Sequence, residues 1–265
     1  MKSYLGIFKM NFKGEIQYRA KAISGMATQI FWAFMYIYLY TAFMGGKIID
    51  GFSLQQMTSY VWLGQAFLVF RFLDLPKNAA HDIESGNICY KFVRPIDLYN
   101  QWYIEYFGNK LAATILRSSP LIVVAFLMPK GMGLMLPVSV EAFLLFLVAI
   151  LLGFLLNAAI CMLIVYLTFK TLSARGTVSI CNTVCGILGG LYIPLVFMPE
   201  GVQKVLNFLP FRYSLDVPAR IYIGNIPPAE ALPFILLGFI WLVVLIAIGK
   251  ILIKRAGNNA VIQGG

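Results

Sequence analysis

The chain has 265 residues, of which 60% are hydrophobic and only 12% are charged, and its formal net charge is +10 at pH 7. Soluble domains carry about 25% charged residues, so an ordinary soluble fold is excluded because it would have no way to bury this much apolar surface. The composition predicts an all-α integral membrane protein whose apolar helices cross the bilayer.

The first segment, residues 1–20, has the periodicity of an amphipathic helix. One face of this helix is apolar and contains Leu5, Phe8, Phe12 and Ile16. The stripe beside it is basic and contains Lys2, Lys9 and Lys13. This pattern predicts an N-terminal interfacial helix with its lysines at the lipid headgroups; the alternative is an ordinary basic flank of the first span. The charged start also lacks the short apolar core of a cleavable signal peptide, and none is expected.

A helix needs about 20 residues to cross a bilayer, and six segments of the chain are apolar over nearly that length. We expect transmembrane helices at 23–44, 57–73, 111–128, 142–169, 178–198 and 232–253. The third contains Arg117, which costs about 2.5–3.5 kcal/mol near the bilayer centre. Leu, Ile, Val and Phe side chains from Leu111 to Leu127 oppose this by about 0.3–0.6 kcal/mol each, and Arg117 is off-centre, where it can snorkel.

Basic residues are distributed unevenly between the two sides of the predicted membrane. With the N-terminus placed in the cytoplasm, 16 of the 21 Lys and Arg residues fall on the inner side or at its boundary, the exceptions being Lys47, Lys130, Lys204, Arg212 and Arg220. This is the positive-inside bias, which predicts that both termini are cytoplasmic. It also accounts for the net charge without nucleic-acid binding.

Two polar or irregular segments separate the spans, within what we interpret as one domain over 1–265. Residues 74–110 are predicted to be a long cytoplasmic segment with short amphipathic helices. Residues 199–231 contain five prolines but stay apolar between them at helical spacing. Broken apolar helices are tolerated at membrane depth where protein buries them, so we expect an outer re-entrant segment after the fifth span.

Several kinds of catalytic and coupling chemistry have no residues to support them in this sequence. It contains no G-x-x-x-x-G-K-[ST] phosphate loop, so ATP hydrolysis is expected in another chain and this one is predicted not to be an enzyme. The single histidine, His81, has no second ligand at metal-binding spacing. None of the eleven Asp and Glu residues lies within a predicted apolar core, whereas ion-coupled carriers keep carboxylates there. The source of energy is therefore expected outside this chain.

Three stretches together resemble the ABC-2 type permease family. They are Ile83 to Ile96, with Phe92-Val93 in place of the commoner leucines, then Pro194 to Gly224, and the ending Val261 to Gly265. The branch they resemble is the one in which two permease genes accompany one ATPase gene. The resemblance implies a six-helix subunit of an ABC exporter in a bacterial cell membrane. It also implies a second permease, identical or homologous, and cytoplasmic ATPase subunits that bind ATP and Mg.

The first inner segment carries the residues that we expect to dock on such an ATPase. They are Glu84, Ser85, Gly86, Asn87, Arg94 and Pro95. Gly86 lets the backbone turn or approach where a side chain would clash, and Arg94-Pro95 would end the docking helix. The alternative is a solvated loop.

The fifth predicted span has the least bulky face in the chain. Small or polar residues recur on it at helical spacing, namely Ser179, Asn182, Thr183, Gly186 and Gly190. Small residues let membrane helices approach closely, and buried hydroxyl and amide groups can bond across them. This face either packs within the same subunit or meets the partner permease, with Asn182 reachable by substrate.

Two other functions are compatible with a bundle of apolar helices. An ion-coupled secondary carrier would work without nucleotide and respond to uncouplers. A non-transport membrane enzyme or scaffold would act without any ATPase. Co-purification of a nucleotide-binding protein distinguishes the permease from both.

Overall fold

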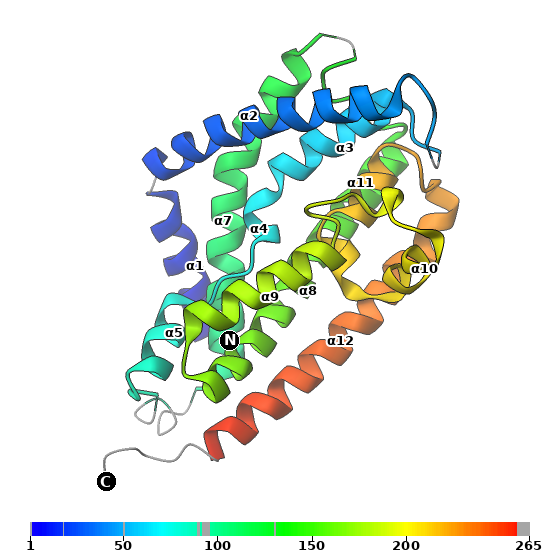
Figure 1. Cartoon of the computed structure of the whole chain (residues 1–265). Helices are drawn as coiled ribbons and strands as arrows, with labels where there is room; N and C mark the ends of the chain where they lie inside the picture. The colour runs from blue at the N-terminus through cyan, green and yellow to red at the C-terminus, as the bar shows by residue number, and fades with distance from the viewer. Residues whose placement is uncertain are drawn as a thin grey trace.

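The computed structural model describes residues 2–17, 19–49, 51–88, 91, 96–129 and 131–258, and the regular structure in these ranges is helical (Figure 1). The helices are α1 (Lys2–Ile16), α2 (Arg19–Met44), α3 (Leu54–Ala66), α4 (Leu68–Arg71), α5 (Lys77–Glu84), α7 (Leu98–Leu127), α8 (Val140–Thr171), α9 (Ala174–Leu188), α10 (Glu200–Phe208), α11 (Asp216–Tyr222) and α12 (Pro228–Asn258), with 3-10 turns η1 (Leu195–Phe197) and η2 (Pro210–Ser214). The predicted all-α class is confirmed.

Three helices are long and apolar enough to cross a membrane: Leu98–Leu127, Val140–Thr171 and Pro228–Gly257. They correspond to the third, fourth and sixth predicted spans. The most deeply buried is α8, which packs against α12, α7 and α11 and forms the centre of the fold.

The helix of the third span begins well before the predicted residue 111. It starts after Asp97, whose side chain accepts a 2.8 Å hydrogen bond from the backbone N–H of Asn100 and so caps α7. The polar residues before 111 therefore belong to a continuous helix. The predicted segment over 74–110 contains the short helix α5, and from Leu98 onward it belongs to α7, because amphipathic residues there continue into a helix that becomes fully apolar only later.

The predicted spans at 57–73 and 178–198 are wrong as continuous helices. The second is interrupted at Phe67, which separates α3 from the single turn α4. The fifth ends at Leu188, where Gly190 has a left-handed φ of +71° and the N–H of Leu191 bonds back to the carbonyl of Gly186. By contrast, α2 runs unbroken through 23–44, although it is not among the three helices that are long and apolar enough to cross a membrane.

The predicted N-terminal helix is present as α1, and it packs along α7. The ring of Phe8 lies 5.6 Å from that of Phe12 and 6.1 Å from that of Phe107, so the predicted apolar face covers another helix. The starts of α1 and α7, the α8–α9 turn, α5 and the end of α12 all lie toward one end of the molecule (Figure 1).

Residues between α9 and α12 fold back into the bundle. Tyr213, in η2, is 1% exposed. It packs against Gly153 of α8 and Gly238 of α12, two positions at which these long helices carry no side chain. Next to it, Arg212 donates hydrogen bonds of 2.8 and 3.2 Å to Asp216, and both side chains are 1% exposed. A buried ion pair of this kind offsets the cost of burying either charge alone.

Two carboxylates are thus buried, which the sequence did not lead us to expect. One is Asp216, paired with Arg212; the other is Glu105 of α7, which accepts a 3.0 Å hydrogen bond from Asn78. The sequence places Glu105 in the predicted cytoplasmic segment and Asp216 in the predicted re-entrant segment, because their neighbours in the chain are polar or proline-rich. Their partners lie on the short helix α5 and in η2, and composition could not reveal either pairing.

The close approach at Gly153 predicts the effect of Gly153→Ala. A methyl group there would overlap the backbone carbonyl of Tyr213, which cannot rotate away as a side chain could. Overpacking of this kind costs about 1–3 kcal/mol, so we expect a lower melting temperature in detergent. Gly201→Ala on α10 is the matched control, because no atom lies within 4 Å of its added Cβ. Equal melting temperatures for the two variants would contradict this packing.

Candidate functional site

A break in the second predicted span is the most unusual feature of the bundle. After Ala66 the chain makes the single turn α4, becomes extended at Phe72 and enters α5 at Lys77. We call residues 67–76 the helix break. Breaking a helix frees backbone N–H and C=O groups, and inside a membrane these must find partners within the protein.

The first of these partners is Lys110 of α7, whose side chain is 10% exposed. Its ammonium donates hydrogen bonds to the carbonyls of Val69, at 3.1 Å, and Phe72, at 2.7 Å. The same nitrogen lies 2.6 Å from the carboxylate of Asp74. One buried charge thereby satisfies two freed carbonyls and has a counter-ion of its own.

Two asparagines also bind the helix break, and we call Lys110, Asn157 and Asn182 together the clamp. Asn157, on the strongly apolar α8, donates a 3.1 Å hydrogen bond to the carbonyl of Phe70. On α9, the amide of Asn182 accepts a 2.7 Å bond from the N–H of Leu73 and also donates to the carbonyl of Leu73. The helix break is therefore held by side chains from α7, α8 and α9. The sequence analysis missed it, although an asparagine within so apolar a segment as α8 was an available signal.

The small-residue face of α9 is divided between the interior and the surface. Asn182 is occupied by the helix break, as described above. A Cβ on Gly186 would lie 2.7 Å from the ring of Tyr192, and a Cβ on Gly190 would lie 3.2 Å from Leu195. These three residues pack within the subunit, and Ser179 and Thr183 are exposed.

Four of the six predicted docking residues, Glu84 to Asn87, lie at the end of α5. Glu84 accepts a 2.8 Å hydrogen bond from the N–H of Ala174, the first residue of α9, which joins this tip to the α8–α9 turn. Ser85, Gly86 and Asn87 are exposed. We call residues 84–87 the α5 tip. Arg94 and Pro95 lie outside the described residues.

Gly86 has the open surroundings expected of a contact point. Its φ is +74°, a conformation that favours glycine, and no atom lies within 4 Å of where a Cβ would be. Beneath the α5 tip, Ile83 and Ile88 are buried, and Asp82 pairs with Lys91. The α5 tip is thus exposed but rests on a packed base.

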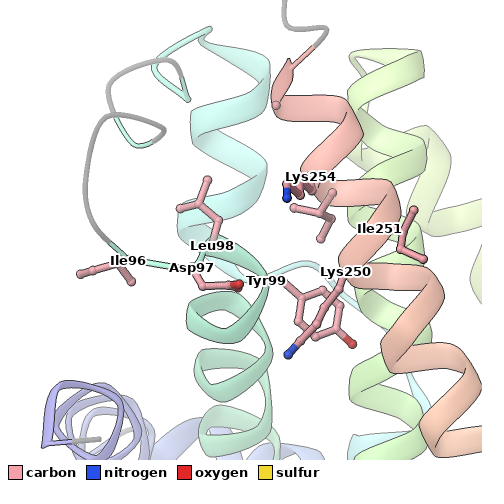
Figure 2. Close-up of a pocket in the computed structure, with 9 residues that line it drawn as sticks. Ile96, Asp97, Leu98, Tyr99, Lys250, Ile251 and Lys254 are labelled. Atoms are coloured by element: carbon pink, nitrogen blue, oxygen red, sulfur yellow. The ribbon is translucent and has the colours of Figure 1, made fainter.

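A pocket of about 410 Å³ opens at this same end, between the start of α7 and the end of α12. Figure 2 shows Lys250 of α12 crossing the ring of Tyr99 of α7, with the ammonium 5.8 Å from the ring centre. The rest of the lining is mostly apolar with one carboxylate and a second lysine, namely Ile96, Asp97, Leu98, Ile251, Ile253, Lys254 and Gly257. In the part of the chain that the structure describes, no cluster of three or more His, Cys, Asp or Glu residues is placed to hold a metal ion.

Residues 29–264 match the family model described as ABC-2 family transporter protein. The match starts within α2 and therefore includes the helix break, the α5 tip, α9 and the segment between α9 and α12. Among curated proteins, no match is found.

The clamp predicts a loss of stability for Asn182→Leu. Leucine has about the same size but leaves the N–H and carbonyl of Leu73 without their partner, and each unsatisfied group costs about 1–3 kcal/mol. The melting temperature should fall clearly. Thr183→Val is the matched control, because the Thr183 hydroxyl is exposed and bonds only to Ser179 in its own helix. A variant that melted like the control would show that the clamp adds nothing.

Proposed function

The chain belongs to the ABC-2 family of transporter proteins, and from that membership we propose that it is the transmembrane permease of an exporter driven by separate ATPase subunits. It would contribute the translocation path and hydrolyse no ATP, which its partners would bind together with Mg. The proposed setting is the cell membrane of a bacterium, with both termini in the cytoplasm and residues 199–231 re-entering the membrane from outside.

The observation that carries this proposal is the α5 tip. It projects at the end of the molecule where α1 begins and α12 ends (Figure 1), which is the predicted cytoplasmic end. Its hydrogen bond to Ala174 ties it to α9, and α5 follows directly from the helix break. An ATPase bound to the α5 tip would therefore act on α9 and the helix break together, since Asn182 already joins these two.

The charge-paired member of the two buried carboxylates, Asp216, is also consistent with an external source of energy. Asp216 is held by Arg212 at two nitrogens, and Arg220 lies 3.9 Å away. A carboxylate so strongly paired is poorly suited to taking up and releasing a coupling ion. This favours the ATP-driven permease over an ion-coupled carrier.

Docking is tested with Gly86→Trp, which would place a large side chain on the α5 tip. We expect the ATPase to be lost from a pull-down in mild detergent, together with transport. Gly131→Trp is the control, because Gly131 also has a positive φ, of +94°, and open surroundings, but it follows the other end of α7. Both variants place a side chain at a positive φ, so both carry backbone strain. If Gly86→Trp retained its ATPase as well as Gly131→Trp does, the α5 tip would not be the docking site.

The exposed half of α9 is the proposed contact with the second permease. Ser179 and Thr183 are small and lie beside exposed apolar residues, namely Ile180, Val184 and Ile187. Small residues allow the close approach of helices in a membrane, and a two-fold interface would place the same residues opposite each other. The substrate path would run between the two permeases.

Cross-linking tests this contact directly. With the four native cysteines replaced by serine, Thr183→Cys should form a disulfide-linked dimer under mild oxidation, because two copies of α9 would face each other. Leu236→Cys, exposed on α12, is the control and should stay monomeric. A dimer from Leu236→Cys but not from Thr183→Cys would move the interface to α12.

A further inference from the structure

Arg71, the last residue of α4, points into the protein. The sequence analysis counted it among the basic residues at the inner boundary, yet it is only 9% exposed. Its Nη1 atom lies 3.5 Å from where a Cβ on Gly64 would be. Gly64 lies in α3, on the far side of the interruption at Phe67, so the guanidinium reaches back along α3, away from the inner end.

This guanidinium lacks a partner of its own. Its Nε and Nη2 atoms are buried and have no hydrogen-bond acceptor among the described residues. The carboxylate that acts on it electrostatically is Asp216, which Arg212 already holds. A buried charge without a close counter-ion is costly and is tolerated mainly where function requires it.

A groove beside Arg71 provides space for a missing partner. Its walls are residues of α2, α3 and the segment after α9, chiefly Tyr36, Tyr40, Tyr60, Gln65, Gly190 and Pro194. The hydroxyl of Tyr60 is buried and also without a partner. The groove is open to the surface, and its volume of about 30 Å³ is more than a water molecule needs, which suits one small polar group better than a whole substrate.

We propose that Arg71 and Tyr60 bind a phosphate group carried by the transported molecule, an inference that rests on the proposed permease function. The guanidinium fork matches phosphate geometry, and a tetrahedral phosphate can accept from both its nitrogens and the tyrosine hydroxyl. The rest of the molecule would extend from the groove, along α2 and α9.

The charges on the surrounding helices favour an external anion over a second copy of the chain. None of α2, α3, α4 and α9 contains an Asp or Glu residue. A second copy that met this one through these helices would therefore bring no carboxylate to Arg71. An anion from outside the dimer supplies the missing charge.

Binding is measured on the purified permease without its ATPase, in a neutral detergent, from the rise in melting temperature that a bound ligand causes. The probes are inorganic phosphate and phosphatidylglycerol, with zwitterionic phosphatidylcholine as the reference lipid. We expect at least one anionic probe to stabilise the wild type and Arg71→Gln to lose that response. The control variant Lys47→Gln removes an equivalent but exposed charge and should still be stabilised by the anionic probe. Stabilisation by phosphatidylglycerol alone identifies a lipid-linked phosphate, and stabilisation by inorganic phosphate identifies a free one.

Two milder variants keep the test decisive if Arg71→Gln does not fold. Arg71→Lys retains the charge but not the fork, and Tyr60→Phe removes one hydroxyl; each should weaken binding severalfold. The proposal is overturned if no anionic probe stabilises the wild type, if phosphatidylcholine acts equally, or if these variants respond like the wild type. It is also overturned if Arg71→Gln dissociates a dimer while anion binding is unchanged. The binding measurements contain no ATPase. A negative result in them therefore does not affect the pull-down test of ATPase docking with Gly86→Trp.

Discussion

Backbone groups freed in the middle of a membrane bundle need partners from the protein itself, because the bilayer core contains no water to supply them. At the helix break, these partners are Lys110, Asn157 and Asn182, on three different helices. The arrangement of α7, α8 and α9 therefore depends on the same hydrogen bonds that hold residues 67–76. A polar network of this kind stabilises a fold only when its members are satisfied together.

The direction of the chain after the break follows from this clamp. With Leu73 held by Asn182 and Asp74 by Lys110, α5 starts beside α9 and its tip reaches the N-terminus of that helix through Glu84. The same break turns Arg71 back along α3. One interruption of a helix thus places both the proposed ATPase contact, outside the membrane, and the proposed phosphate site, within the subunit.

The opposite half of the fold relies on close packing around one tyrosine. Tyr213 fits between α8 and α12 because Gly153 and Gly238 have no side chains, and its hydroxyl donates to the carbonyl of Phe234 on α12. Its neighbour Arg212 has its counter-ion in Asp216. In contrast to Arg71, this buried arginine is fully paired and serves the structure. This difference in pairing supports the proposed binding role of Arg71.

Apolar content and period by themselves determined the all-α membrane class, the helices at 142–169 and 232–253 and the amphipathic α1, because these depend on local composition alone. The absence of a phosphate loop likewise follows from the sequence. Only the tertiary structure decided that the second span breaks, that Asn182 faces Leu73 instead of a pathway, and that Arg71 is buried. The break and the position of Asn182 depend on hydrogen-bond partners some 40 to 110 residues away in the chain, and no local pattern encodes a partner at that distance. The burial of Arg71 follows from the break, which turns its side chain back along α3.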